Sequence, residues 1–566
     1  MNALLLSLWL AGAAVPVPPA DLVLADLVMV NGGIFTADPA RPWAQALAVR
    51  GETILAVGSN AEIRALAGPD TRIVDLAGRM ALPGFHDSHL HAISGGRGLR
   101  GCWLDADSIE ETITQLQACA TRMPDGVLYA QGVDPTLFPG VLMRKEILDA
   151  AFPDRGVVVQ PSDGHNTWVN SKALELAGIT RDTPDPENGE IVRDAATGEA
   201  IGTLRETAGN LLDAHLPQRT PESDLQALTA AQDYLLGVGV TSVSDIARST
   251  RDWAAWQAFE RSGRMKLKVR AALVYRDHAE YPPGDFETQW AARHEYASGR
   301  LSTNSVKLYL DGVLEGETAV LLEPYLVDKP HAGKLMHEPA ALNALVTRFD
   351  AEGAQVVMHA IGDAAVRAGL DAFAAARVAN GPRDNRHHIT HLQLIHPDDY
   401  ERFAELGVSA SFQALWAWPD TWITDLNLPV VGPQRVERMY PIGSVHRSGG
   451  RIAGSSDWDV SSANPLDAIE TALRRQNPDT DDGAVLNAAE RMELSAMLMA
   501  YTANGAFLMH HERSCGVLAS ALLADIVVLD RKLFEIPLTE INETRVVLTI
   551  SGGEVVFEAT PPGKDK

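Results

Sequence analysis

Two histidines separated by one residue form the strongest local pattern in this sequence that could do chemistry. His89 and His91 lie in residues 82–92 (LPGFHDSHLHA), directly after a short apolar run. Because side chains alternate along a strand, both imidazoles would point to the same side, as two ligands of one metal ion must. A chain with 17 histidines also produces such a pair by chance, so the motif alone suits a structural role equally well.

Three further candidates each follow a β-branched or apolar run typical of a buried strand. His359 ends the run in AQVVMHAIGD, His391 lies in HHITHLQLI, and Asp457 lies in RIAGSSDWD. The intervals are 391 − 359 = 32 and 457 − 391 = 66 residues, which correspond to one and two strand–helix units. Metal-binding residue types at several strand ends are hard to obtain from packing alone, since a core histidine lies more often within an element beside one partner.

A (β/α)8 barrel would bring these strand ends together at one mouth. Runs with the composition of buried parallel strands alternate with helix-like stretches such as DAAVRAGLDAFAAARVA. A doubly wound open sheet is the alternative, and it is disfavoured because no glycine-rich phosphate turn follows the early strands. We predict eight strands, at residues 81–85, 240–246, 268–275, 305–310, 355–359, 388–392, 408–412 and 451–455.

The ends of the chain predict a smaller unit beside the barrel. Residues 21–80 and 515–566 contain short apolar runs broken by turns, which indicates β-hairpins, and we expect them to form one small β-sandwich. The barrel would then occupy residues 81–514. Its first two strands lie about 150 residues apart, far more than one strand–helix unit needs. We therefore expect an insertion at about 96–236 that covers the barrel mouth, because the first strand delivers the chain to that end.

Composition and the first residues limit the partners and the location. The 566 residues are enough for a large core, and 48 Lys and Arg against 74 Asp and Glu give a net charge of −26. Such an acidic surface argues against nucleic acid as a partner.

Residues 1–20 resemble a secretory signal peptide, although no Lys or Arg precedes the apolar run. We therefore expect a periplasmic or secreted protein, or a cytoplasmic one if this start is not a signal. No later segment reaches the roughly 18 apolar residues of a membrane span, so we expect no stable membrane anchor.

The cysteines suggest little covalent or metal chemistry. Cys102, Cys119 and Cys515 are widely spaced and odd in number. We therefore expect neither a disulfide framework nor a CxxC zinc site. Any metal would have to be held by histidine, carboxylate or a less usual ligand.

The order HxH, His, His and Asp on strands 1, 5, 6 and 8 resembles the amidohydrolase superfamily. It is most similar to the family 3 branch, which includes N-substituted formamide deformylases, and SDGHNTWVNSKALELAGI, VKLYLDG, THLQ, GSSDW and ADIVVLD extend the likeness over nearly the whole chain. In such relatives a strand-4 lysine is carboxylated by CO₂ and bridges two metals, and Lys307 matches that position. Burial beside metals would be costly for a lysine cation, whereas a carbamate is an anionic ligand; pairing with Asp311 is the alternative.

The resemblance implies two divalent metal ions, for which Zn²⁺ suits the ligand types. One ion would take His89, His91 and Asp457, the other His359 and His391, with the carboxylated Lys307 between them. Two cations would bring the pKa of a shared water near neutrality and polarise a carbonyl, while Asp457 acts as base and then as acid. We expect hydrolysis of a non-peptide C–N bond in a small amide-like substrate; a mononuclear deaminase and a non-catalytic metal-binding barrel are the alternatives.

Other residues are candidates for the surroundings of this site. For the tryptophans among them core packing is the commoner role. His86 precedes the HxH pair and is better suited to orienting the turn, and Glu206 matches a position of the family. Such barrels are commonly dimers, so a homodimer is compatible with the sequence. Residues that could line a substrate pocket are His165, Asn166 and Trp168 in the insertion and Trp416 and Trp418 after strand 7.

Overall fold

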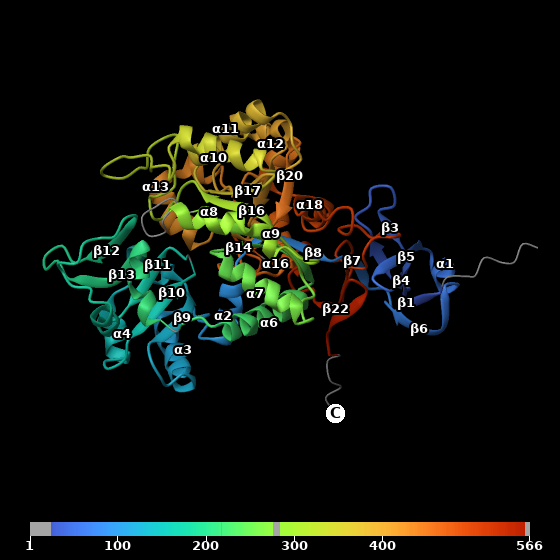
Figure 1. The fold of residues 1–566 in the computed structure, drawn as a ribbon, viewed down its shortest axis with the longest axis horizontal. Helices are drawn as coiled ribbons and strands as arrows, with labels where there is room; N and C mark the ends of the chain where they lie inside the picture. Colours follow the sequence, from blue (N-terminus) through green and yellow to red (C-terminus); the bar gives the residue numbers. More distant parts are fainter. Residues whose placement is uncertain (1–23, 163, 217, 276–282, 481, 561–566) are drawn as a thin grey trace, which may run out of the picture.

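Eight parallel strands form the central sheet of this protein, whose computed structural model describes residues 24–162, 164–216, 218–275, 283–480 and 482–560. The predicted signal peptide, residues 1–20, lies outside this part. The strands follow the order of the chain across the sheet, which confirms the parallel barrel sheet (Figure 1). They are β8 (Phe85–Leu90), β14 (Val240–Ala247), β15 (Lys268–Val274), β16 (Leu301–Tyr309), β17 (Gln355–Ala360), β18 (His388–His391), β19 (Ser409–Phe412) and β20 (Arg451–Gly454).

Contacts between the first and last strands bring the two edges of the sheet together. The Ser88 hydroxyl on β8 donates to the Gly454 carbonyl on β20 at 2.9 Å. Just beyond the strands, the Asp457 amide donates to the His89 carbonyl at 2.8 Å, and the His91 amide donates to the Trp458 carbonyl at 2.6 Å. These bonds lie at the barrel mouth, the end where the strands finish, so the first and last metal-ligand candidates are held side by side by the backbone.

Helices cover the outside of the barrel sheet, which explains the apolar character of its strands. Strands buried on both faces read as near-continuous apolar runs, and every residue of β14, β15 and β17 is buried. Figure 1 shows helices above and below these strands. They include α6 (Pro221–Gly237), α7 (Thr250–Arg261), α10 (Pro339–Ala351), α11 (Asp363–Asn380) and α12 (Tyr400–Leu406).

The first predicted barrel strand, at 81–85, is wrong. The run Met80–Pro83 is β7, which pairs with the C-terminal strand β21 (Ile526–Leu529), and the barrel strand is β8, Phe85–Leu90. Gly84 separates them where the chain passes close to Thr241, since a Cβ at Gly84 would lie 2.3 Å from the Thr241 hydroxyl oxygen. Hydrophobicity marks both runs as buried, but only long-range pairing decides which sheet each one joins.

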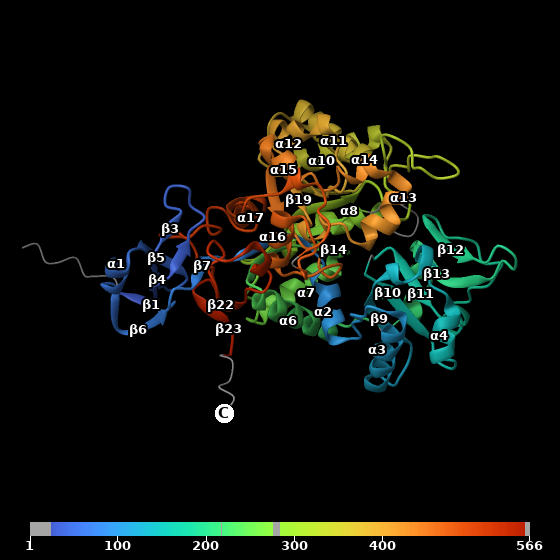
Figure 2. The same cartoon turned by 180° about the vertical axis from the view of Figure 1, so that it is seen from behind.

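The terminal segments form two further sheets at one side of the barrel (Figures 1 and 2). One has the order β5-β4-β1-β6 and the other β23-β22-β21-β7-β2-β3, so the second combines both ends of the chain. Leu27 and Met29 share a buried cluster with Ile526 and Ile550. The remaining strands are β1 (Ala25–Val30), β2 (Gly33–Phe35), β3 (Trp43–Ala44), β4 (Ala46–Arg50), β5 (Thr53–Gly58), β6 (Ala67–Asp75), β22 (Val546–Ser551) and β23 (Glu554–Glu558).

The chain between β8 and β14 forms a separate sheet on the opposite side of the barrel from the terminal sheets (Figures 1 and 2). Its five strands have the order β12-β13-β11-β10-β9 and enclose their own buried clusters. The predicted insertion, 96–236, also contains α6, which contacts β14 and therefore belongs to the barrel. The strands are β9 (Leu128–Val133), β10 (Val157–Pro161), β11 (Asn166–Val169), β12 (Gly189–Arg193) and β13 (Ala200–Glu206).

A disulfide bond joins Cys102 and Cys119, so the expectation of no disulfide framework is wrong for this pair. Cys102 follows α2 (Ala92–Arg100), Cys119 lies on α3 (Ile109–Arg122), and their Cα atoms are 5.6 Å apart. An odd number of cysteines does not forbid one bond, and Cys515 is left as a buried free thiol. Among the described residues, no helix has both the length and the apolar character needed to cross a membrane.

Candidate metal centre

Three of the predicted ligands meet at the barrel mouth. His89 is the second-last residue of β8 and His91 follows this strand, while Asp457 follows β20. The Asp457 Oδ1 atom lies 3.3 Å from Nε2 of His89 and 3.2 Å from Nε2 of His91. One ligand atom of each residue lies within 4.8 Å of those of the other two, a grouping that could hold one metal ion.

His359 and His391 complete a group of four imidazoles. The ring centroids of these two residues are 4.5 Å apart, and the His391 ring lies 5.1 Å from that of His89. His391 Nδ1 is 3.9 Å from Asp457 Oδ2. His391 and Asp457 also have positive φ angles, 77° and 56°, a conformation that is strained for non-glycine residues. The ends of β17 and β18 therefore deliver a second pair of ligands beside the first group.

The hydrogen bonds of this second pair leave one lone pair free on each ring. His359 Nε2 lies 3.1 Å from the Gly312 carbonyl oxygen, which can only accept, so Nε2 carries the proton. Gln413 uses its amide nitrogen to donate to Thr390 and Ser455, so its oxygen accepts from His391 Nδ1 at 3.0 Å. Fixing the tautomer in this way is what residues around a metal commonly do for its histidine ligands. The sequence did not single out Gln413, although it directly follows β19.

Lys307 lies fully buried between the two groups. It is on β16, and its Nζ atom is 3.2 Å from Nε2 of His89. Burial lowers its pKa to about 7, against a smaller opposing effect of Asp457. Asp311, the alternative partner, instead accepts backbone N–H bonds from Val320, Ile361 and Gly362 at 2.9, 3.0 and 2.9 Å.

An unpartnered carboxylate oxygen of the centre fits a divalent ion. Within the described residues, Asp457 Oδ1 is buried and has no hydrogen-bond partner. Buried polar atoms are rarely left so, and a metal would satisfy the carboxylate oxygen. Burial also lowers the pKa values of His89, His359 and His391 well below the usual range, so these imidazoles are neutral, the form that binds metals.

Asp87 supports the centre from within β8. Its Oδ1 accepts from the amides of His89 and Ser456 at 3.1 and 3.2 Å, and its Oδ2 accepts from the Ser456 hydroxyl at 2.5 Å. The carboxylate thus ties the turn after β8 to the turn that carries Asp457. Burial raises its pKa to about 7, an effect that these hydrogen bonds oppose. Sequence reasoning missed this residue, although it lies two positions before His89.

The proposed pocket residues have different environments. His165 of the insertion reaches the centre, with its ring 6.5 Å from that of His359, and its Nδ1 lies 3.2 Å from the Glu206 carboxylate. Trp416 stacks in parallel on His391 at 5.9 Å. Trp168 is fully buried against Phe138 and donates to a backbone carbonyl, so it belongs to the core of the insertion.

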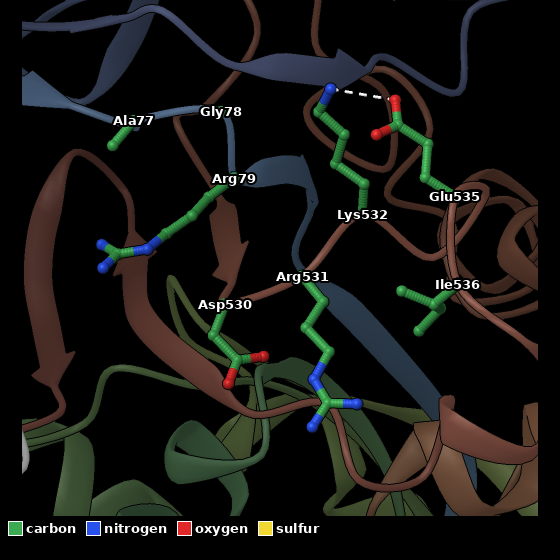
Figure 3. A pocket seen from close by; sticks show the side chains of 8 residues that line it. All are labelled: Ala77, Gly78, Arg79, Asp530, Arg531, Lys532, Glu535 and Ile536. Carbon is green, nitrogen blue, oxygen red and sulfur yellow. Dashed lines mark hydrogen bonds and ion pairs between the residues drawn. The ribbon is translucent and has the colours of Figure 1, made fainter.

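The other two pocket candidates lie close in sequence to these residues. Asn166 begins β11, directly after His165, and Trp418 is half-buried two residues after Trp416. A surface hollow elsewhere is lined by residues 77–79 and 530–532 with Glu535 and Ile536, where the terminal segments meet (Figure 3). None of the predicted metal ligands lines this hollow, so we place the candidate site at the barrel mouth.

Comparison with known proteins identifies the family of this chain. The sequence profile of the amidohydrolase family matches residues 72–557. Protein LONG AFTER FAR-RED 3 of Arabidopsis thaliana is 31% identical over 560 residues, covering 95% of this chain and 93% of that protein. N-substituted formamide deformylase of Arthrobacter pascens is 25% identical over 559 residues, covering 95% and 99%.

A solved structure shows the same fold. An uncharacterized metal-dependent hydrolase of Pyrococcus horikoshii superimposes with a TM-score of 0.71 at 25% identity, covering 90% of this chain and 99% of that one. The family profile thus spans most of the chain, and the relatives align over nearly their whole lengths. This chain belongs to the amidohydrolase family.

Proposed function

We propose that this protein is a metal-dependent hydrolase that uses two divalent ions, preferably zinc, to cleave a non-peptide C–N bond in a small amide-like substrate. The observation that carries the proposal is the convergence of neutral imidazoles, a carboxylate without a hydrogen-bond donor and a fully buried lysine at one barrel mouth. His89, His91 and Asp457 would hold one ion, His359 and His391 the other. Lys307, carboxylated on its neutral amine, would join them.

Asp457 is the residue that we assign to proton transfer. When bound, the two ions would acidify a water and polarise the scissile carbonyl. The carboxylate lies at the edge of the mouth, where it can take the proton of the attacking water and return it to the leaving amine. Gln413 and Asp87 act through other residues, since they fix the His391 ring and the turn that carries Asp457.

The amide class of substrate rests on the family and on one relative. The Arthrobacter pascens relative is named for removal of a formyl group from N-substituted formamides. A ring that stacks on a ligand, Trp416, and the His165–Glu206 pair lie beside the same centre. An apolar face and a polar pair beside one centre suit an N-acyl or N-formyl amine, with its substituent against the tryptophan.

A mononuclear deaminase remains the alternative reaction, and one contact opposes it. That chemistry needs a carboxylate near the strand-5 histidine, for which Asp363 is the nearest candidate in sequence. In the structure Asp363 begins α11 and accepts from the Leu322 amide at 2.8 Å. One oxygen of this carboxylate therefore holds the loop before α10, and we favour hydrolysis of an amide.

A screen of N-formyl and N-acyl amines with zinc-loaded enzyme tests the proposal. We expect release of amine and carboxylic acid, loss of turnover after chelation, and recovery when zinc is returned. Asp363→Asn serves as a matched variant, since an amide hydrolase should retain most of its turnover. Ammonia release from an amino-heterocycle that Asp363→Asn abolishes would instead establish the deaminase, and no turnover on any amide would overturn the proposal.

A further inference from the structure

Three potential ligands meet at the barrel floor, the end where the parallel strands begin and the opposite end from the candidate metal centre. His86 is the second residue of β8 and pairs in register with Ser242 of β14. His511 and Cys515 come more than 400 residues later, in the segment after α18 (Ala503–Leu508) that leads to β21. A Cβ at Gly505 of α18 would lie 2.5 Å from the His86 side chain, so this helix packs directly on the histidine.

The spacing of these three side chains is that of a metal site. One ligand atom of each lies within 4.8 Å of those of the other two. The Cys515 Sγ atom lies 3.6 Å from Nε2 of His86. In a tetrahedral zinc site, with Zn–S about 2.3 Å and Zn–N about 2.0 Å, sulfur and nitrogen ligands are about 3.5 Å apart.

Hydrogen bonds hold both imidazoles through Nδ1, and they fix the tautomer of His86. His86 Nδ1 lies 3.2 Å from the Gly84 carbonyl oxygen, which can only accept, so Nδ1 carries the proton and the Nε2 lone pair faces Cys515. The Ser242 hydroxyl oxygen lies 3.2 Å from His511 Nδ1 and 3.2 Å from the Met509 sulfur, so it holds the His511 ring through Nδ1. Each ring is thus held through Nδ1, the arrangement by which second-layer groups orient histidine ligands.

Burial and charge at the barrel floor also suit a bound cation. His86 is 0% exposed and Cys515 is 1% exposed, whereas His511 is partly exposed, so the three side chains would leave the fourth position of a tetrahedral ion to another ligand, such as water. Lys268, the neighbouring ammonium group, forms an ion pair with the buried Asp525 and is neutralised by it. A metal there would displace the thiol proton and balance the resulting thiolate.

We propose that His86, His511 and Cys515 form a structural site for a thiophilic divalent ion such as zinc, separate from the centre at the mouth. The ion would fasten the start of β8 to the segment between the last barrel helices and β21. It would therefore link the barrel to the terminal sheets, whose strand β7 immediately precedes β8. This inference does not depend on the reaction proposed above.

Cobalt substitution tests the site through a signal that the barrel mouth cannot produce. Full-length protein made in cobalt-supplemented minimal medium should show a thiolate-to-cobalt charge-transfer band in the near ultraviolet, because Cys515 is the free cysteine of the described chain and the mouth residues offer only nitrogen and oxygen. Cys515→Ser should abolish the band and lose about one equivalent of metal per chain, while amide turnover is retained. Protein without the band, or equal metal in both forms, would overturn the site and show a hydrogen-bonded network instead.

A second variant separates this site from the mouth. Lys307→Ala should lose the ions of the mouth but keep the charge-transfer band, because Lys307 lies at the other end of the barrel. If Cys515→Ser fails to fold, His511→Gln provides the replacement, since His511 is partly exposed and glutamine keeps most of its volume. Retention of an unchanged band in His511→Gln would remove that residue from the proposed site.

Discussion

We propose two roles for Asp457, as a metal ligand and as the carrier of a proton, and one substitution can separate them. Asp457→Asn keeps the size of the side chain and one coordinating oxygen but removes the basic carboxylate. We expect a folded protein that keeps most of its metal and loses a factor of about 10² to 10⁴ in kcat, the usual contribution of general acid–base catalysis. Metal content and steady-state kinetics measure the two effects.

The leaving group provides the control for this substitution. An amine must be protonated to leave, whereas the leaving group of an activated ester departs as an anion. The substitution should therefore lower kcat by a larger factor for amides than for activated esters with the same acyl group. An equal loss on both, or a variant without metal, would make Asp457 chiefly a ligand.

The bridging role of Lys307 can be tested by removing its side chain and supplying a carboxylic acid in its place. Lys307→Ala should lose the metal of the mouth and most activity, because the anionic bridge between the two ligand groups is absent. Short carboxylic acids should restore part of the turnover by occupying the space beside His89. Full turnover and unchanged metal content in the variant would show that Lys307 bridges nothing.

The pKa of Lys307 predicts how its carboxylation depends on pH in the metal-free protein. Burial lowers this pKa to about 7. Only the neutral amine attacks CO₂, and its fraction rises about tenfold between pH 6 and pH 8 for such a pKa. At equal dissolved ¹³CO₂, the carbamate signal in NMR should therefore be stronger at pH 8. Equal signals at both pH values, or the same signal in Lys307→Arg, would contradict carboxylation of the neutral Lys307 amine.

At the scale of elements, Gly84 marks the point where the chain passes from the terminal sheet to the barrel. Gly84→Ala should destabilise the protein by about 1–3 kcal/mol, the usual cost of overpacking, because the added Cβ meets Thr241 at 2.3 Å. Chemical denaturation measures the change. Adding Thr241→Ala should recover part of the loss.

Gly237→Ala is the matched control for this clash. Gly237 ends α6, and an added Cβ there would have its nearest neighbour at an ordinary 3.8 Å. This variant should be about as stable as the parent protein. Equal stability of Gly84→Ala and Gly237→Ala would mean that the junction between β7 and β8 relaxes without cost.

At the scale of the whole molecule, the disulfide supports the proposal that the protein is exported. Disulfides persist mainly in oxidising compartments, and Cys102–Cys119 lies within the insertion. Expressed with its own start in a bacterial host, the protein should reach the periplasm with its N-terminus trimmed between about residues 13 and 20. Cell fractionation and N-terminal sequencing check this outcome.

A truncated form provides the comparison for export. Protein that lacks residues 2–20 should stay in the cytoplasm, with Cys102 and Cys119 reduced. Thiol labelling after rapid acid quenching distinguishes the two states. Full-length, untrimmed protein that is found only in the cytoplasm would remove the signal-peptide hypothesis.

Local patterns in the sequence were sufficient to predict most of the barrel and the residues at its mouth. Seven predicted strands, from 240–246 to 451–455, each overlap an observed strand of the barrel sheet. Strand and helix periodicity depends on neighbouring residues, and parallel strands must end at the same edge of the barrel. His89, His91, His359, His391 and Asp457 could therefore be placed together before any contact was known, while their roles as ligands remain a proposal.

Only the tertiary structure decided features that depend on residues distant in sequence. It assigned Met80–Pro83 to the terminal sheet, because β21 supplies its partner from more than 400 residues away. It paired Cys102, which follows α2, with Cys119 of α3, and it placed Gln413 and Asp87 around the ligands. It also brought His86 to His511 and Cys515. Spacing along the chain carries no information about such contacts, which arise when the barrel closes and the terminal segment returns to its floor.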